Sequence, residues 1–352
     1  MLFRSGYTAA LRIGDDGVDL YETHGDADGR RFLRGGGERE CKPAEPHSFR
    51  KVYYPSMRWI ALLAVATASG QVLLNPPKDA GTLTVDVNVV GVYCSVRDKS
   101  GALVTGLKKE DFAVRDEGKK QAISYFSDEA STPLTVALLI DVSGSVAAFL
   151  EEEKAAAGRF FREVLQKGDQ AMVIGFGSRV VVWKDMTQSI DELLAGLAEV
   201  KDMPPPPTAA WRGGTQLYSS VHLAGTRKLR RTPGRKAMIL ITDGVDSGSV
   251  VNRDAAIRAA QESDSIVYVI HYGSEALGEM EKLAEPTGGK VFSVAKDATL
   301  RKAFTTIGDE LRHLYALGYA LPEDAKPGQY RKLEVKTPKA QVRVRQGYFV
   351  HR

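Results

Sequence analysis

The chain of 352 residues is poor in the residue types that organise several specialised classes of protein. It has two cysteines, Cys41 and Cys94, at a spacing that matches no zinc or redox motif. A disulfide between them requires that both remain in the mature chain. The six histidines lack metal-ligand spacing, and a formal net charge of +4, from 48 basic and 44 acidic residues, leaves little basic excess. The sequence therefore argues against a disulfide framework, a cysteine–histidine metal centre and a nucleic-acid partner.

Long apolar runs are also missing, and a short one near the N-terminus has its own meaning. Residues 59–66 (WIALLAVA) are apolar, but a membrane-spanning helix needs about 20 such residues, so we expect no transmembrane segment. Arg58 precedes this run, and the small residues 66–68 (Ala-Thr-Ala) follow it. A positive charge, a short apolar run and a small-residue cleavage site are the features of a secretory signal peptide, here starting at Met57.

We therefore predict a signal peptide over residues 57–70 and export to the periplasm, the cell surface or the medium. Residues 1–56 show no sustained periodicity, and we interpret them as a mis-assigned upstream extension or a disordered segment. The alternative is a cytoplasmic protein in which the apolar run is a buried segment or part of a disordered tail. Cleavage near Ala68 leaves Cys94 alone, which favours a small residue packed in a strand.

The rest of the sequence changes its hydrophobic pattern twice. Residues 82–128 are rich in Val and Thr and alternate apolar with polar side chains, which predicts a small β domain of about four strands. Over residues 133–315, continuous apolar runs alternate with amphipathic segments, which predicts a doubly wound α/β fold: a mostly parallel, Rossmann-like sheet with helices on both faces. Residues 316–352 return to strand patterns. We expect the two flanking segments to form one small β unit interrupted by the α/β domain.

The α/β region also gives approximate element boundaries. Ser145 and Asn252 are predicted N-caps of the helices that follow them, and residues 204–207 (four prolines) predict a rigid loop. The expected strands are 134–140, 170–176, 179–183 (antiparallel to its neighbour), 237–242, 265–271 and 291–292, and the expected helices are one after Ser145 and those at 190–197, 216–229, 253–262, 276–284 and from 297 onwards. For the flanking C-terminal segment the expected strands are 315–321, 331–337 and 342–350.

The strongest chemical signal is the run Asp141-Val142-Ser143-Gly144-Ser145, directly after the predicted strand 134–140. Open α/β sheets bind ligands at the carboxyl ends of their strands. Thr215, after two glycines, and Asp243, at the end of a later strand, complete an Asp-x-Ser-x-Ser, Thr, Asp series. In this order and context the sequence resembles the von Willebrand factor A family and its metal-ion-dependent adhesion site (MIDAS). The whole layout is similar to a group of bacterial proteins in which such a domain lies between short β segments.

The resemblance implies a metal site formed by Asp141, Ser143, Ser145, Thr215 and Asp243. In the family the hydroxyls bind the ion directly and the aspartates often act through water. Such oxygen ligands suit hard ions, so we expect Mg²⁺, with Ca²⁺ or Mn²⁺ as alternatives. The implied function is a non-enzymatic, adhesion-type module whose ion is completed by an acidic residue of a protein partner. The alternative is the same fold with an empty site, in which Asp141 and Ser145 only cap turns and helix ends.

Two other functions are consistent with this fold family. One is an intracellular accessory subunit of a metal chelatase or chaperone-like ATPase assembly. The other is a hydrolase whose metal activates water, although the sequence offers no obvious general base beside the site. Asp246 either tunes the site electrostatically or is an exposed turn acid, and Trp211 either packs or lines the binding face. The helix 297–313, joined directly to the C-terminal β segment, is a candidate for coupling the site to that segment.

Overall fold

The structure is a computed structural model and describes residues 8–14, 17–25, 31–32, 89–128, 132–202, 214–273, 275–295, 297–338 and 340–350. The chain divides into two compact units. The smaller unit is Tyr7–Val87, and the larger consists of Met1–Gly6 and Asn88–Arg352. The predicted signal peptide, Cys41, the proline loop and Trp211 lie outside the described residues. Within the described part of the chain, no helix is long and apolar enough to cross a membrane.

The smaller unit contains strands where we expected none. An antiparallel sheet is formed by β1 (Thr8–Gly14), β2 (Gly17–Gly25) and β3 (Arg31–Phe32), in that order. The β1–β2 hairpin closes between Gly14 and Gly17, which pair with each other. Glycine beside a short connection is a hairpin signal that apolar periodicity does not register.

The larger unit is built around a six-stranded sheet in the order β10-β9-β8-β11-β12-β13. Its strands are β8 (Leu134–Asp141), β9 (Gln170–Phe176), β10 (Val180–Thr187), β11 (Arg235–Thr242), β12 (Ser265–Tyr272) and β13 (Val291–Val294). All neighbours are parallel except β10, which runs antiparallel to β9. β8, β11 and β12 are buried along their whole length, as their continuous apolar runs predict.

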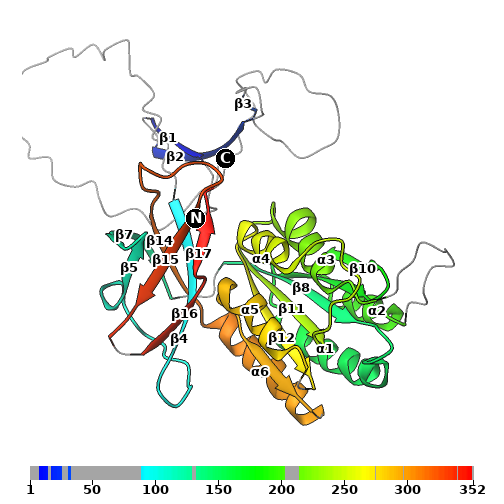
Figure 1. Cartoon of the computed structure of the whole chain (residues 1–352). Helices are drawn as coiled ribbons and strands as arrows, with labels where there is room; N and C mark the ends of the chain where they lie inside the picture. The colour runs from blue at the N-terminus through cyan, green and yellow to red at the C-terminus, as the bar shows by residue number, and fades with distance from the viewer. Residues whose placement is uncertain are drawn as a thin grey trace, which may run out of the picture. The chain divides into compact units, whose positions relative to one another are not determined.

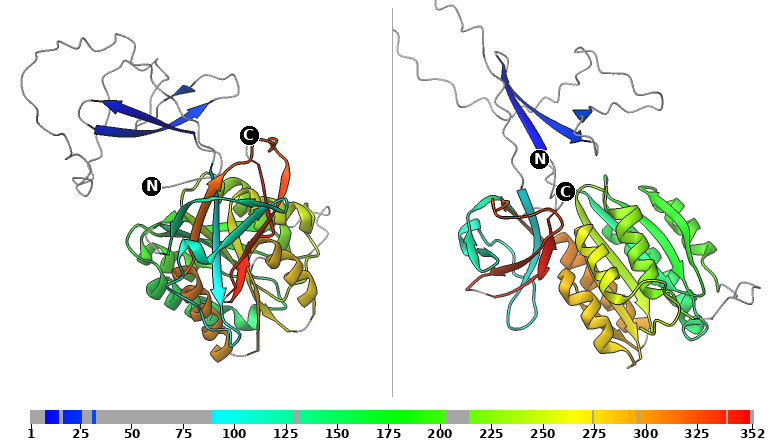
Figure 2. Two further views of the ribbon diagram at one scale, coloured as in Figure 1. Left: turned by 90° about the vertical axis from the view of Figure 1, so that its left-hand side faces the viewer. Right: turned by 45° about the horizontal axis from the view of Figure 1, so that its top comes forward.

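Helices cover both faces of this sheet (Figures 1 and 2). One face is covered by α1 (Leu150–Val164), α2 (Ile190–Glu199) and α6 (Asp297–Arg312), and the other by α3 (Leu217–Leu223), α4 (Arg253–Glu262) and α5 (Leu277–Ala284). On α6 the i, i+4, i+7, i+11 residues Leu300, Phe304, Ile307 and Leu311 are all buried. The predicted doubly wound fold is therefore confirmed.

Two local predictions need correction, and one is confirmed. Ser145 does not cap a helix, because the 3₁₀ turn η2 (Ala147–Phe149) intervenes and α1 begins only at Leu150. The predicted helix 216–229 is α3 followed by the π-helical segment η3 (Ala224–Leu229). Within η3 the backbone of Gly225 approaches α4 so closely that a Cβ atom would lie 2.6 Å from the Ala259 carbonyl oxygen. Asn252 caps α4 as predicted, since its Oδ1 accepts a hydrogen bond from the Ala255 amide at 2.9 Å.

The flanking segments together form two four-stranded antiparallel sheets, β16-β4-β14-β7 and β17-β15-β5-β6 (Figure 1). From the N-terminal segment come β4 (Val89–Arg97), β5 (Ala113–Asp116), β6 (Lys119–Gln121) and β7 (Ile123–Ser127), and from the C-terminal one β14 (Tyr315–Ala320), β15 (Tyr330–Lys336), β16 (Gln341–Val344) and β17 (Gly347–Phe349). β14 pairs with both β4 and β7, and β15 with β5, so the predicted single β unit is confirmed. We call it the flanking β unit. Cys94 on β4 is fully buried there and is a free thiol.

The expected strand 342–350 is two strands that belong to different sheets. The break lies at Arg345, whose guanidinium forms an ion pair with Asp264 and donates a hydrogen bond to the Gly91 carbonyl. At this break the chain leaves β16 and enters β17 on the other sheet. Asp264 directly precedes β12, so this residue also joins the flanking β unit to the α/β domain.

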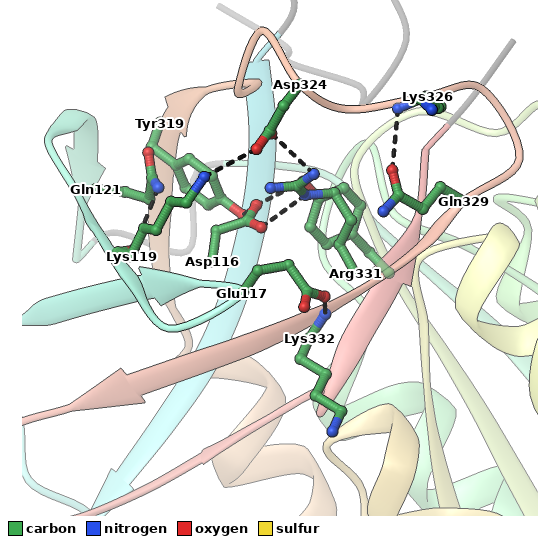
Figure 3. Close-up of polar contacts among 11 residues, drawn as sticks. Asp116, Glu117, Lys119, Gln121, Tyr319, Asp324, Lys326, Gln329, Arg331 and Lys332 are labelled. Carbon is green, nitrogen blue, oxygen red and sulfur yellow. Dashed lines mark hydrogen bonds and ion pairs between the residues drawn. The ribbon is translucent and has the colours of Figure 1, made fainter.

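A buried polar cluster lies in the interior of the flanking β unit (Figure 3). Asp116, with no exposed surface, accepts hydrogen bonds from the hydroxyls of Tyr319 at 2.8 Å and Tyr348 at 2.7 Å. Its other carboxylate oxygen accepts from Arg331 Nε at 2.7 Å, and Arg331 also contacts the more exposed Asp324 at 3.0 Å. The cluster ties four strands of the two sheets together, because Asp116 ends β5 while its partners lie on β14, β15 and β17.

Candidate functional site

The candidate site is built around the loop that follows β8. β8 and β11 are adjacent and parallel, with Ile140 opposite Ile241, so Asp141 and Thr242 are the next residues on their strands. The Thr242 hydroxyl donates to Asp141 Oδ2 at 2.7 Å, and the Ser143 amide donates to Asp141 Oδ1 at 2.9 Å. Asp141 is only 1% exposed. The carboxylate is therefore buried and held in one orientation by the strand register and by the turn that follows.

The charged form of the Asp141 carboxylate is disfavoured by its surroundings in the protein. Burial raises the pKa of Asp141 to about 6, hydrogen bonds from Thr242 and Ser143 oppose the rise, and repulsion from Asp243 adds to it. Among the described residues, no Lys, Arg or His forms an ion pair with either aspartate. Two carboxylates without a protein cation attract a positive ion from solution, since a buried unpaired charge is costly.

The two serines of the motif add hydroxyl oxygens. Ser143 Oγ and Ser145 Oγ lie 3.0 Å apart and form one hydrogen bond with each other. Ser145 is exposed and Ser143 half-buried, so the pair lies between the buried Asp141 and solvent. The Ser145 hydroxyl, which η2 separates from α1, is thus part of this pair.

The Thr215 segment is attached to the neighbouring loops through its backbone. The Thr215 amide donates to Ser247 Oγ at 3.0 Å, and the Thr215 carbonyl accepts from the Ser247 and Gly248 amides, each at 3.1 Å. The next amide, of Gln216, donates to the Gly177 carbonyl after β9 at 2.9 Å. Gly214 adopts φ +112°, and a Cβ atom there would lie 2.6 Å from Ser247 Oγ. Thr215 is thus placed between the loops that follow β9 and β11, on the same edge of the sheet as Asp141.

Asp243 follows β11 and is half-buried. Its Oδ1 accepts a hydrogen bond from the Val245 amide at 3.2 Å, and its carbonyl lies 2.9 Å from His271 Nε2. Direct contacts therefore join Asp141, Ser143 and Ser145, and electrostatic repulsion links Asp243 to Asp141. Thr215 reaches this edge through its backbone, and no hydrogen bond among the described residues joins its side chain to the other four.

The donor set fits a hard divalent cation. It offers carboxylate and hydroxyl oxygens and no sulfur or imidazole nitrogen, which is the chemistry that Mg²⁺, Ca²⁺ and Mn²⁺ prefer. Nowhere in the described ranges do three or more His, Cys, Asp or Glu side chains gather closely enough to hold a metal ion by themselves. A cation at this edge would therefore rest on hydroxyls as well as on carboxylates, as the sequence pattern predicts.

The structure adds residues that sequence reasoning missed or interpreted incompletely. Thr242 was assigned only to a buried strand, and its role as a donor to Asp141 follows from the register of β8 and β11. Asp246 is half-buried and accepts from the Tyr218 amide at 3.2 Å and from Ser249 Oγ at 2.5 Å, so it is not a free turn acid but anchors the start of α3. Glu153 is buried on α1, although a glutamate on a helix normally indicates an exposed position.

The sequence of the chain matches a family model and is similar to known proteins. The model of a family described as von Willebrand factor type A domain matches residues 135–306. The chain is 28% identical to calcium-activated chloride channel regulator 1 of Bos taurus over 193 residues, 52% of this chain and 20% of that protein. To the Sus scrofa protein of the same name it is 28% identical over 158 residues, 44% of this chain and 16% of that protein. The chain thus spans a fifth or less of the length of these curated relatives.

Solved structures with a similar fold have low sequence identity to the chain. One is proximal thread matrix protein 1 from the mussel byssus, whose MIDAS motif is occupied by zinc: the TM-score is 0.47 and the identity 18%, over 56% of this chain and 50% of that one. Another is a von Willebrand factor type A protein from Catenulispora acidiphila, with a TM-score of 0.44 and 15% identity, over 68% of this chain and 72% of that one.

Proposed function

Residues 135–306 belong to the von Willebrand factor type A family, and on this basis we propose that the chain is a protein-binding module whose edge at Asp141 holds a divalent cation. The observation that carries the proposal is the buried Asp141 carboxylate, which is repelled by Asp243 and has no cationic partner among the described residues. We assign Ser143, Ser145 and Thr215 as hydroxyl ligands and the two aspartates as carboxylate ligands, direct or through water.

These residues favour a hard cation that prefers oxygen ligands. We propose Mg²⁺, with Ca²⁺ and Mn²⁺ as alternatives. When bound, the cation would offer one coordination position to a carboxylate of a partner protein. The chain's own residues orient the site: Thr242 and the Ser143 amide fix the Asp141 carboxylate, and Ser247 fixes the Thr215 backbone.

The surface beside the site supports a protein as the partner. Val245 and Val250, 41% and 87% exposed, are two of the three large hydrophobic side chains that are exposed in the described part of the chain. Both lie in the loop that follows Asp243. This loop is ordered by hydrogen bonds, among them Val250 N to Ser219 Oγ at 3.0 Å and Ser219 N to Ser249 Oγ at 2.9 Å. Exposed apolar side chains on an ordered loop suit a partner with an acidic residue flanked by aliphatic ones.

We infer binding and not catalysis at this site. A metal-dependent hydrolase needs a general base that can reach a water molecule. His271, whose Nε2 lies 2.9 Å from the Asp243 carbonyl, has no exposed surface, so it is poorly placed to take a proton from a substrate. We also propose that the module acts outside the cytoplasm, because residues 57–70 have the pattern of a signal peptide. The sequence of the exported protein should begin near Ser69, and a mature chain that retains residues 1–56 would contradict export by this route.

Calorimetric titration of the metal-stripped full-length chain tests the proposal. Mg²⁺, Mn²⁺ and Ca²⁺ are titrated into the natural protein and into the Asp141→Asn, Ser145→Ala and Ser293→Ala variants. Ser145→Ala removes one exposed hydroxyl and should leave folding intact. Ser293→Ala makes the same chemical change at an exposed position on the edge strand β13 and serves as the matched control.

We expect saturable binding of one cation, lost in Asp141→Asn, weakened in Ser145→Ala and unchanged in Ser293→Ala. Once binding is established, an acidic peptide with neighbouring aliphatic residues should bind only in the presence of the cation. Equal binding by the natural protein and Asp141→Asn, or no cation uptake at all even with such a peptide, would contradict the proposed function.

A further inference from the structure

Glu153 is a glutamate that is buried in the α/β domain although it lies on a helix. It lies on the first turns of α1 and is 1% exposed, whereas its neighbours Glu151 and Glu152 are exposed. Neither of its carboxylate oxygens accepts a hydrogen bond of standard geometry from the residues that the structure describes. Buried carboxylates are nearly always paired, because desolvation without compensation is costly. The position therefore requires an explanation other than the fold of α1.

The surroundings of Glu153 connect it to the candidate site. Phe149, four residues earlier and one helical turn away, stacks on the ring of Tyr272 with 4.7 Å between ring centroids. Tyr272 ends β12, the strand beside β11, and its register places it next to the position of Asp243. Glu153 thus lies on the N-terminal end of α1, next to a residue that packs against the strand ends carrying the candidate ligands.

The titration of Glu153 agrees with this location. Burial, together with repulsion from Asp141, raises its pKa to about 8, although a hydrogen bond from the Tyr272 hydroxyl opposes the rise. The other charged group that affects it is the exposed Glu152, and no basic side chain among the described residues offsets the charge. The domain therefore places two buried carboxylates near each other, and a third, Asp243, acts on the first.

We propose that Glu153 is a positioning residue of the cation site, whose carboxylate accepts hydrogen bonds from water molecules that accompany the cation. The inference rests on the proposed function, and it deepens it. Both oxygens of Asp141 already accept hydrogen bonds from the protein, so a further acceptor on the α1 side would orient the water shell. Carboxylates that act in this way typically change metal affinity by about 10- to 100-fold.

This role predicts effects of opposite sign on stability and on binding. Without the cation, and at a pH above its raised pKa of about 8, Glu153 destabilises the domain because its charged carboxylate is buried near Asp141 with only the Tyr272 hydroxyl to offset it. With the cation, the same carboxylate contributes to binding. A residue that only supports the fold would show a different signature, since its removal would lower the stability of the metal-free protein.

The test compares the natural full-length chain with Glu153→Gln and with the matched control Glu152→Gln, which changes the adjacent exposed glutamate in the same way. Mn²⁺ and Mg²⁺ affinities are measured by calorimetry, and melting temperatures are measured with and without saturating cation. For Glu153→Gln we expect a 10- to 100-fold loss of affinity. We also expect a higher melting temperature of the metal-free protein at a pH above the raised pKa of Glu153, about 8, where the natural side chain is charged. Glu152→Gln should match the natural protein in both measurements.

The outcomes separate this inference from the proposed function. If the natural protein takes up no cation, both fail. If it binds the cation and Glu153→Gln binds within about threefold of it, a difference of well under 1.4 kcal/mol, only the inference fails. A lower melting temperature of metal-free Glu153→Gln, or its failure to fold, would also overturn the inference, because either result identifies Glu153 as a structural residue.

Discussion

Replacing Asp116 with asparagine should destabilise the flanking β unit by an amount that the structure allows us to estimate. Asp116 has no exposed surface and pairs with Arg331, which is 2% exposed. Asparagine keeps the shape of the side chain but removes its charge. The Arg331 guanidinium then remains buried with only Asp324 as a charged partner. Removing one member of a buried pair typically costs about 3–5 kcal/mol, because the other charge is left uncompensated.

Urea denaturation followed by circular dichroism measures this change, with Asp324→Asn as the control. Asp324 contacts the same guanidinium and Lys119, but its side chain is 53% exposed. An exposed pair contributes about 0–1 kcal/mol, so Asp324→Asn should lower the free energy of unfolding by no more than that. The double variant Asp116→Leu with Arg331→Met removes both charges and should be more stable than Asp116→Asn alone. A loss within about 1 kcal/mol for Asp116→Asn would refute the reasoning, since solvent or neighbouring groups would then already neutralise Arg331.

Three further predictions concern the α/β domain. Thr242→Val removes the hydroxyl that donates to Asp141, so it should weaken cation binding in calorimetry, whereas Thr242→Ser keeps the donor and should bind normally. The melting temperature of the metal-free protein should fall as the pH rises from about 4 to about 8, because the folded-state pKa values of Asp141 and Glu153 are raised to about 6 and about 8. In the Glu153→Gln variant the melting temperature should depend less on pH over this range. Glu310→Gln should cost about 1–3 kcal/mol in urea denaturation, since it removes the buried charge that pairs with the partly exposed Arg97 and Arg343, and a loss below about 1 kcal/mol would show that the pair is solvated.

Much of the fold could be predicted from sequence because burial on both faces leaves a strong pattern. β8, β11 and β12 are continuous apolar runs, and the apolar spacing along α6 gives its buried stripe. The short polar strand β6 was missed since Lys119–Gln121 has no apolar alternation. Its strand conformation is set by pairing with β5 across the two-residue turn Glu117-Gly118, whose φ angles are 47° and 76°, and such a turn is not visible in apolar periodicity.

The candidate site also has residues that the sequence predicts and residues that only the structure reveals. The Asp-x-Ser-x-Ser run lies within five residues, so its position after β8 is evident from the sequence. By contrast, Thr242 and Glu153 act on Asp141 only through the register of two strands and the packing of α1. Neither residue type signals its role, because threonine is ordinary in strands and glutamate is ordinary on helices. Contacts between elements therefore had to come from the structure.

The interleaving of the flanking strands determines how coupling between the two parts of the larger unit can be tested. β14 lies between β4 and β7, and β15 lies between β17 and β5, so removing residues 315–352 would take internal strands out of both sheets. Loss of function in such a truncation would report unfolding of the flanking β unit and not coupling. Glu310 offers a more specific change, because it lies on α6 and accepts hydrogen bonds from Ser95 on β4 and Tyr268 on β12, each at 3.0 Å. If α6 relays the state of the cation site to the flanking β unit, Glu310→Gln should change cation affinity as well as stability, whereas a loss of stability with unchanged affinity would identify this contact as structural.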